Sequence, residues 1–326
     1  MNGLPFQTEY RNLGFMIDDQ KTITWLLEGD LAVQYQIHRD LLHSRVSLQK
    51  KLQARIEKEG WGAQFLSKQQ ENGHWGRGFY QPKWTSTHYT LLDLKNIGLA
   101  QDNIFARKSV RMIFEQAIGQ DGSVNYSKTL KDSDVCINGM VVNFAAYFRM
   151  MGKRLDSLIE YLLATQMRDG GWNCEHVRGA THSSLHTTIS VLEGLLEYKK
   201  AGGDHRIKEI EKAELKGIEF ILIHRLYQSH RTGKIIDKKM LMLSYPSRWR
   251  SDILRALDYF QAARIEYDSR MDPAIEILLK KRRRDRRWPV QMKHPGQVHF
   301  DMEATGRPSR WNTLRALRVL NHFQIR

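Results

Sequence analysis

The sequence has few cysteines, few prolines and no long uninterrupted apolar run. Two cysteines, Cys136 and Cys174, occur among 326 residues, which excludes a disulfide framework and predicts a reducing, cytoplasmic location. Seven prolines and 41% hydrophobic residues favour helices over a loop-rich β architecture. The most apolar stretch, residues 137–148, contains Asn138 and Asn143, whereas a membrane helix needs roughly 18 to 20 apolar residues in succession. We therefore expect no transmembrane segment, and the first residues also lack a secretory signal pattern.

Acidic residues are also under-represented, since 36 Asp and Glu face 51 Lys and Arg, which leaves a formal charge of +15. An excess of this size favours an anionic partner or substrate without naming one. Part of it lies in the run Lys280-Lys-Arg-Arg-Arg-Asp-Arg-Arg287. Because no aromatic residues are interleaved with it, we interpret the run as a solvated helix end and do not expect nucleic-acid binding. The sequence alone does not assign a role to this basic run.

A repeated motif organises the chain. Gln69-Gln-Glu-Asn-Gly-His-Trp75 and Gln166-Met-Arg-Asp-Gly-Gly-Trp172 share the form Q-x-x-x-G-x-W, and the shorter Gln120-Asp-Gly-Ser lies between them. The spacing of about 50 residues is typical of helix-pair repeats. Apolar segments with helical periodicity follow each turn, for example residues 90–99 and 188–198. Each turn is therefore expected to end one helix and to precede the next.

These repeats predict an all-α, single-domain (α/α)6-type toroid over residues 1–326, in which inner and outer helices alternate. Pro-Ser-Arg-Trp occurs twice near the C-terminus, ending at Trp249 and Trp311, so the repetition continues there. A closed ring buries helix faces against their neighbours and leaves a central cavity. We expect function at the mouth formed by the N-termini of the inner helices. These helices should begin near Leu31, Ser86, Val135, His186, Ser251 and Trp311.

One group of residues could bind a metal. Asp134 and Cys136 lie at the start of one expected inner helix, and His186 opens the next. A carboxylate, a thiolate and an imidazole are zinc ligands, and three protein ligands leave a fourth position for water or substrate. Alone, an Asp-x-Cys pair is weak evidence, because a free cysteine is usually a small buried hydrophobe. In the repeat context it predicts a catalytic zinc site.

The repeat turns resemble those of the α/α-toroid superfamily that includes squalene cyclases and protein prenyltransferase β subunits, most strongly over residues 60–200. The pattern from Lys128 through Lys131 to Asp134-Val-Cys136, with the later His186-Thr, is similar to the segment that binds diphosphate and zinc in prenyltransferase β subunits. The resemblance implies that Lys128 and Lys131 bind a diphosphate. Prenyltransferase β subunits work with a partner subunit, and whether this chain needs one stays open. The chain is also similar to bacterial proteins labelled prenyltransferase or squalene-cyclase repeat proteins.

The sequence hypothesis is therefore a zinc-dependent, prenyltransferase-like enzyme that acts on an isoprenoid or lipid diphosphate. Two alternatives stay open: a metal-free, terpene-cyclase-like enzyme, and a non-catalytic toroid that binds a peptide, glycan or nucleic acid. The D-x-D-D acid of class II terpene cyclases is absent from the sequence. Cation–π packing that closes the ring explains the Arg-Trp pairs as well as a role in lining the cavity does. Seven further residues near inner-helix starts are predicted to line the cavity: Trp84, His88, His182, Arg248, Trp249, Arg310 and Trp311.

Overall fold

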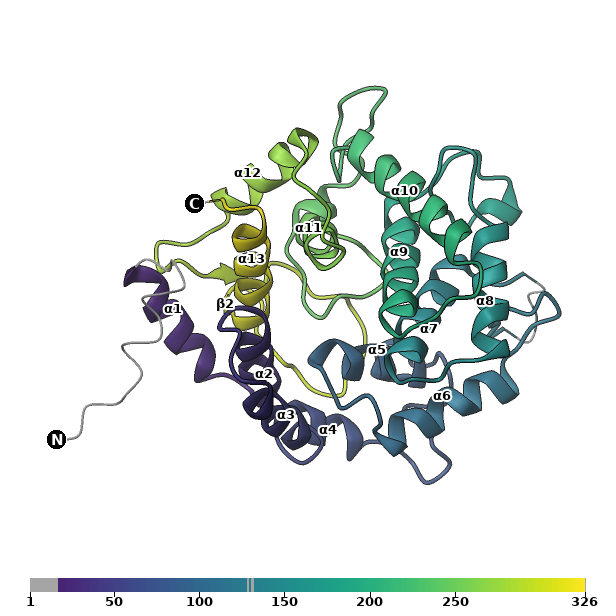
Figure 1. Ribbon diagram of the computed structural model, residues 1–326, viewed down its shortest axis with the longest axis horizontal. Coiled ribbons are helices and arrows are strands. Elements are labelled where there is room, and N and C mark those ends of the chain that lie inside the picture. Colours follow the sequence, from purple (N-terminus) through teal and green to yellow (C-terminus); the bar gives the residue numbers. More distant parts are fainter. Residues whose placement is uncertain (1–16, 128, 130–131, 326) are drawn as a thin grey trace.

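The computed structural model describes residues 17–127, 129 and 132–325, and its helices form two concentric rings (Figure 1). The toroid predicted from the repeats is confirmed, and the inner helices begin within two residues of the expected positions. The inner ring consists of α2 (Leu31–Asp40), α5 (Thr87–Ile97), α7 (Val135–Tyr147), α9 (Leu185–Lys200), α11 (Ile253–Ala262) and α13 (Arg310–His322).

The outer ring alternates with the inner one along the chain. It consists of α1 (Ile17–Leu27), α3 (Val46–Arg55) with α4 (Gly60–Leu66), α6 (Ile104–Gln116), α8 (Lys153–Ala164), α10 (Ile207–Ile223) and α12 (Asp272–Lys280). Short elements complete the fold: η3 (Lys83–Thr85), η4 (His176–Arg178), η5 (Lys238–Leu241), η6 (Ser269–Met271), and the antiparallel pair of β1 (Trp288–Pro289) and β2 (Pro308–Ser309). None of the helices in the described part of the chain has the length and apolarity required to span a bilayer.

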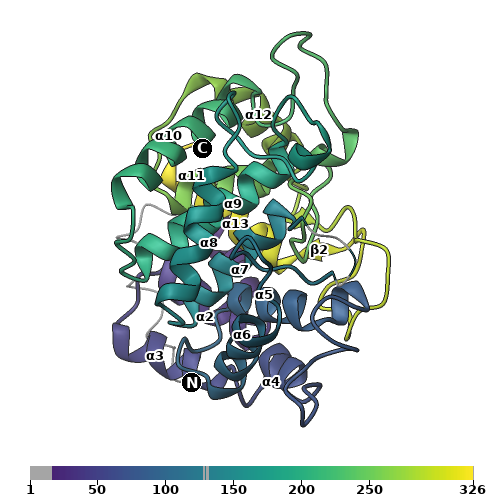
Figure 2. The same cartoon turned by 90° about the vertical axis from the view of Figure 1, so that its right-hand side faces the viewer.

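Position in the two rings explains the composition of the helices. In α7 nearly every residue is buried, because this inner helix packs against α5, α8 and α9. In α8 only one face is buried, as expected for an outer helix with helical spacing of its leucines. The buried hydrophobic side chains of both rings form one core cluster. Figure 2 shows the molecule from the side on which the outer helix α8 lies in front of the inner helix α7.

Two glycines permit the close approach of α7 and α9. A Cβ atom at Gly139 would lie 2.8 Å from the Cα atom of Val191, and a Cβ at Gly194 would overlap the backbone of Gly139. Because real Cβ atoms do not approach backbone so closely, any larger residue would push the helices apart. The glycines therefore fix the spacing of two neighbouring inner helices.

The repeat turns join outer to inner helices through a buried tryptophan. Each backbone N–H of the tryptophan donates to a threonine hydroxyl of the following inner helix, at 3.0 to 3.1 Å. Each indole N–H donates to a carbonyl at the end of the preceding outer helix, at 2.7 Å in all three turns: Trp75 to Phe65, Trp172 to Leu162 and Trp288 to Leu278. The motif thus satisfies a helix-terminal carbonyl that has no partner within its own helix.

The basic run at residues 280–287 forms the third of these turns. Arg286 occupies the position of the motif glycine and has φ 60°, the left-handed conformation that glycine adopts easily. Its N–H donates to the Arg283 carbonyl at 2.9 Å, just as Gly73 donates to Gln70 at 2.8 Å. Arg287 then stacks over Trp25 of α1, 4.1 Å from the ring centre. The run is therefore part of the repeat structure and connects the last outer helix to the first.

We expect Trp172→Phe to destabilise the chain by about 1–3 kcal/mol, because the Leu162 carbonyl stays buried but loses its donor. Urea denaturation monitored by circular dichroism measures this difference. Trp249→Phe is the matched control, since Trp249 is half-buried and its indole has no hydrogen bond to the described residues. Equal stability of the Trp172→Phe variant and wild type would contradict the role given to the indole N–H.

Candidate ligand-binding cavity

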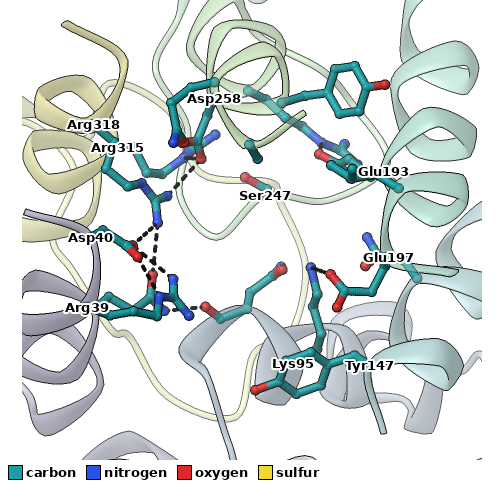
Figure 3. A pocket seen from close by; sticks show the side chains of 18 of the residues that line it. Arg39, Asp40, Lys95, Tyr147, Glu193, Glu197, Ser247, Asp258, Arg315 and Arg318 are labelled. Atoms are coloured by element: carbon teal, nitrogen blue, oxygen red, sulfur yellow. Dashed lines mark hydrogen bonds and ion pairs between the residues drawn. The ribbon is translucent and has the colours of Figure 1, made fainter. Parts of the chain in front are cut away.

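A cavity of about 770 Å³ lies on the ring axis, inside the inner helices. Its walls are formed mainly by the C-terminal halves of these helices, together with Tyr245 and Ser247 from the segment before α11 (Figure 3). The sequence prediction placed the functional mouth at the other end, where the inner helices begin. The larger cavity corrects that expectation.

The N-terminal ends of the inner helices are covered by residues 293–303. The Trp84 indole N–H donates to the Pro295 carbonyl at 2.6 Å, and His299 is hydrogen-bonded to the Thr90 hydroxyl at 2.9 Å. Phe300 packs on Phe65 of α4 with their ring centres 4.7 Å apart. Only a small cavity of about 90 Å³ remains among these residues. Residues 293–303 therefore cover the part of the expected mouth beside α4 and α5.

One wall of the large cavity carries a network of ion pairs. Arg318 of α13 donates to Asp40 of α2 at 2.7 Å and to Asp258 of α11 at 2.9 Å (Figure 3). Arg39 also donates to Asp40, and Arg315 to Asp258 at 3.1 Å. Burial acts to raise the pKa of Asp40, but the guanidinium groups of Arg39 and Arg318 outweigh this effect and lower it to about 2. The network connects three inner helices and keeps the Asp40 carboxylate ionised.

Two further ion pairs lie across the cavity. Arg255 of α11 makes a bidentate contact with Glu193 of α9, at 2.7 and 2.9 Å, and Lys95 of α5 lies 3.4 Å from Glu197 (Figure 3). All four carboxylates of the cavity wall are therefore paired with basic side chains. Each of these ion pairs except Arg39–Asp40 joins two different inner helices, so the pairs hold the wall together around the cavity.

Basic groups outnumber acidic ones in the wall. Lys200 and Arg264 have no ion pair with any described carboxylate, and desolvation by the surrounding protein lowers the pKa of Lys200. Five buried polar atoms of the wall have no described partner: Asn143 Oδ1, Asp258 Oδ1, Trp311 Nε1, Arg315 Nη1 and Arg318 Nε. The seven basic residues are Arg39, Lys95, Lys200, Arg255, Arg264, Arg315 and Arg318, against the acidic Asp40, Glu193, Glu197 and Asp258.

The remainder of the wall is aromatic or amide-bearing, with little aliphatic surface. Five aromatic residues, Tyr35, Tyr147, Tyr245, Tyr259 and Trp311, contribute rings, whereas Leu92, Leu196 and Ala262 are the only aliphatic residues among the described ones that line it. Tyr245 stacks on Trp311 with ring centres 5.0 Å apart. The cavity thus offers many hydrogen-bonding groups and flat rings, but no extended hydrocarbon surface.

The predicted metal ligands are located at the opposite end of the inner helices. Asp134 precedes α7, and burial is the main cause that raises its pKa. His186 accepts a hydrogen bond at Nδ1 from the Ser251 N–H at 2.9 Å, and burial with nearby Arg255 lowers its pKa to about 4. Among the described residues no group of three or more His, Cys, Asp or Glu side chains is arranged to hold a metal. Asp134, Cys136 and His186 therefore do not fit zinc as a three-ligand set.

Cys136 instead lies against the other cysteine of the chain. The Cys136 N–H donates to the Cys174 sulfur at 3.1 Å, and the Thr187 hydroxyl donates to the same sulfur at 3.6 Å. Hydrogen bonds from Cys136 lower the pKa of the Cys174 thiol. Spacing along the chain gave no signal for this contact, since Cys174 follows a repeat turn and Cys136 begins an inner helix.

The predicted substrate residues are distributed over the structure. Lys128 and Lys131 are outside the described residues. His88 is fully buried in α5, where burial lowers its pKa to about 3, and its Nδ1 contacts the Tyr126 hydroxyl at 3.2 Å. His182 is exposed in the loop before α9. Neither histidine lines the large cavity.

The Arg-Trp pairs have separate roles. Arg248 is buried, forms a 2.5 Å ion pair with Asp93, and with Trp84 lines the small cavity. Arg310 stacks over Trp25, 4.6 Å from its ring centre, so cation–π packing does contribute to closing the ring. Trp249 packs edge-on against His186. Among the members of the predicted set that the structure describes, only Trp311 lines the large cavity.

Comparison with known proteins finds distant structural similarities and no match by sequence. No family model matches the sequence, and no curated protein matches it. Among solved structures, a glycosyl hydrolase of family 88 from Bacteroides vulgatus matches with a TM-score of 0.49 and 13% identity, covering 90% of each chain. The type II terpene cyclase MstE from Scytonema matches with a TM-score of 0.44 and 14% identity, covering 90% of this chain and 88% of the other. A variant of that cyclase in complex with geranylgeranyl dihydroxybenzoate matches with a TM-score of 0.42 and 14% identity, again covering 90% of this chain and 88% of the other. These similarities concern the fold alone.

Proposed function

We propose that this toroid binds a small acidic carbohydrate, such as a uronic-acid sugar, in its central cavity. The observation that carries the proposal is the wall itself, in which seven basic residues face four acidic ones and only three residues are aliphatic. Arginine and lysine recognise carboxylate or phosphate groups, and the volume falls within the range of small-molecule sites, roughly 300–1,000 Å³.

The aromatic and amide groups narrow the ligand class further. A sugar presents both hydroxyl groups and apolar ring faces. In the wall, Asn143 and Gln36 can hydrogen-bond to hydroxyl groups, and the Tyr and Trp rings can pack against the apolar faces. The Asn143 side chain is 1% exposed and its Oδ1 has no described partner. Because a buried acceptor without a donor is costly, a ligand or water hydroxyl donating to it would stabilise the bound state.

Support for the isoprenoid diphosphate expected from the sequence is weaker. A diphosphate would find basic partners here, but its hydrocarbon tail would lie against charged and hydroxyl-bearing side chains. Zinc is not part of the proposal, because the described residues do not gather three metal donors. Binding rather than a reaction is proposed, since each cavity carboxylate already accepts a hydrogen bond or forms an ion pair with a basic side chain.

Calorimetric titration with digalacturonate, inorganic diphosphate and geranylgeranyl diphosphate tests the proposal. We expect digalacturonate to bind, with an affinity that falls as salt is added. Lys200→Ala and Arg264→Ala should each weaken it about tenfold, equivalent to about 1.4 kcal/mol. Lys50→Ala is the matched control, because it removes an exposed charge of α3 outside the cavity.

The other ligands separate the alternatives. Stronger binding of geranylgeranyl diphosphate than of digalacturonate would overturn the carbohydrate proposal in favour of the isoprenoid class. Binding of inorganic diphosphate alone would assign the site to phosphate anions without a sugar. Affinities unchanged in both cavity variants would place the ligand elsewhere on the protein.

A further inference from the structure

The contact between Cys136 and Cys174 joins two separate repeats. Cys136 is the second residue of α7, and Cys174 lies two residues beyond the repeat-turn Trp172. The Cys174 sulfur accepts the Cys136 backbone N–H at 3.1 Å. Both cysteines are free and half-buried, so a small molecule can reach them while most of their surface is enclosed.

The surroundings of Cys174 favour negative charge on its sulfur. The N–H of Cys136 belongs to the first turn of α7, where backbone donors have no partner within the helix. The Thr187 hydroxyl donates from α9 at 3.6 Å. Donors at a helix N-terminus stabilise a sulfur anion, which is the form that reacts with oxidants.

We propose that Cys136 and Cys174 are a peroxide-reactive pair that forms a reversible disulfide between the start of α7 and the loop before α9. The Cys174 sulfur attacks one oxygen of hydrogen peroxide, the O–O bond breaks, and the other oxygen leaves as water with the thiol proton. The Cys136 sulfur then attacks the resulting sulfenic acid, an S–S bond forms, and the S–O bond breaks to release a second water. Two thiols are oxidised and one peroxide is reduced to two waters.

The proposal depends on the two sulfurs meeting without rearrangement of the inner ring. The cysteines are 38 positions apart in sequence, yet a backbone hydrogen bond already fixes one against the other. The first turn of α7 carries one partner, and the connection between α8 and α9, residues 165–184, carries the other. A disulfide with sulfurs about 2.05 Å apart therefore needs only a local approach.

Peptide mass spectrometry of the full-length wild-type protein tests the pair. Reduced, chelator-treated protein is exposed to an equimolar amount of hydrogen peroxide, alkylated under denaturing conditions and digested. We expect a crosslinked peptide containing Cys136 and Cys174, lighter by two hydrogens, formed at a rate independent of protein concentration and lost on treatment with a dithiol. In Cys136→Ser, dimedone should label Cys174, because its sulfenic acid has no resolving thiol.

Three outcomes would overturn the proposal. Full alkylation of both cysteines after peroxide treatment would show that they do not react. Crosslinks between different molecules only would show that the two sulfurs of one chain do not meet. Stoichiometric zinc in the protein as purified, bound through both sulfurs and protecting them from peroxide, would assign the cysteines to a metal site. Since the wild-type result does not require any variant to fold, failure of Cys136→Ser to fold leaves the test intact.

Discussion

The variant Asp258→Ala is expected to lose about 3–5 kcal/mol of folding free energy, because it leaves buried guanidinium groups without a counter-charge. Asp258 is the acceptor for Arg315, whose side chain is 6% exposed, and one of two carboxylate acceptors for Arg318. Without it, Arg315 would lose its ion-pair partner, and Arg318 would keep Asp40 alone. Urea denaturation at neutral pH measures the loss.

A double-variant cycle separates charge from packing in this network. Arg315→Met together with Asp258→Ala removes both partners of one ion pair. The double variant should therefore lose less folding free energy than the two single variants lose together. Asp258→Asn keeps the shape of the side chain and should lose less than Asp258→Ala. If the two single losses simply add, Arg315 does not depend on Asp258 and the network is not cooperative.

The positions of the helices could be predicted because the repeat turns are local. Two of them have a glycine in the left-handed conformation and a buried tryptophan two residues later, so the same motif recurs in the sequence. The segments 69–75 and 166–172 therefore predict a helix end before the turn and a helix start after it. The third turn was missed because Arg286 stands where the motif has glycine. Its backbone adopts the same conformation, and the tryptophan alone keeps the pattern.

The cavity could not be located in the same way. Its wall is assembled from a few residues of each of the six inner helices, and most ion pairs among its charged residues join different helices. One signal was present in the sequence, because Glu193 and Glu197 lie four residues apart on an otherwise apolar helix that becomes α9. The partners of these carboxylates, Arg255 and Lys95, are far away in sequence. Only the closed ring brings them together.

The metal hypothesis depended on the same kind of long-range convergence. Asp134 and Cys136 are neighbours by sequence, but the direction of His186 depends on what packs around it, and it is oriented by the Ser251 N–H and Trp249. The cysteine partner that the fold provides, Cys174, lies 38 positions further along the chain. A sequence spacing can thus predict which helices are adjacent without predicting which side chains meet.

Arg248→Met is the second substitution with a large expected effect, and its effect should depend on pH. Arg248 is the ion-pair partner of Asp93, whose side chain is 1% exposed in α5. Burial already raises the pKa of Asp93, against the lowering effect of Arg248. Without the guanidinium, a buried and unpaired carboxylate would cost about 3–5 kcal/mol at neutral pH.

The sign of the pH effect follows from the raised pKa of Asp93. In the folded variant this carboxyl binds a proton more readily than in the unfolded chain, so stability should increase as the pH falls through its folded pKa. We therefore expect Arg248→Met to recover part of its loss between neutral pH and about pH 5, and Arg248→Met with Asp93→Asn to lack that recovery. Urea denaturation of both variants and wild type at the two pH values measures this. A loss of stability independent of pH would show that Arg248 acts through its packing on Trp84 and Tyr89 rather than through its charge.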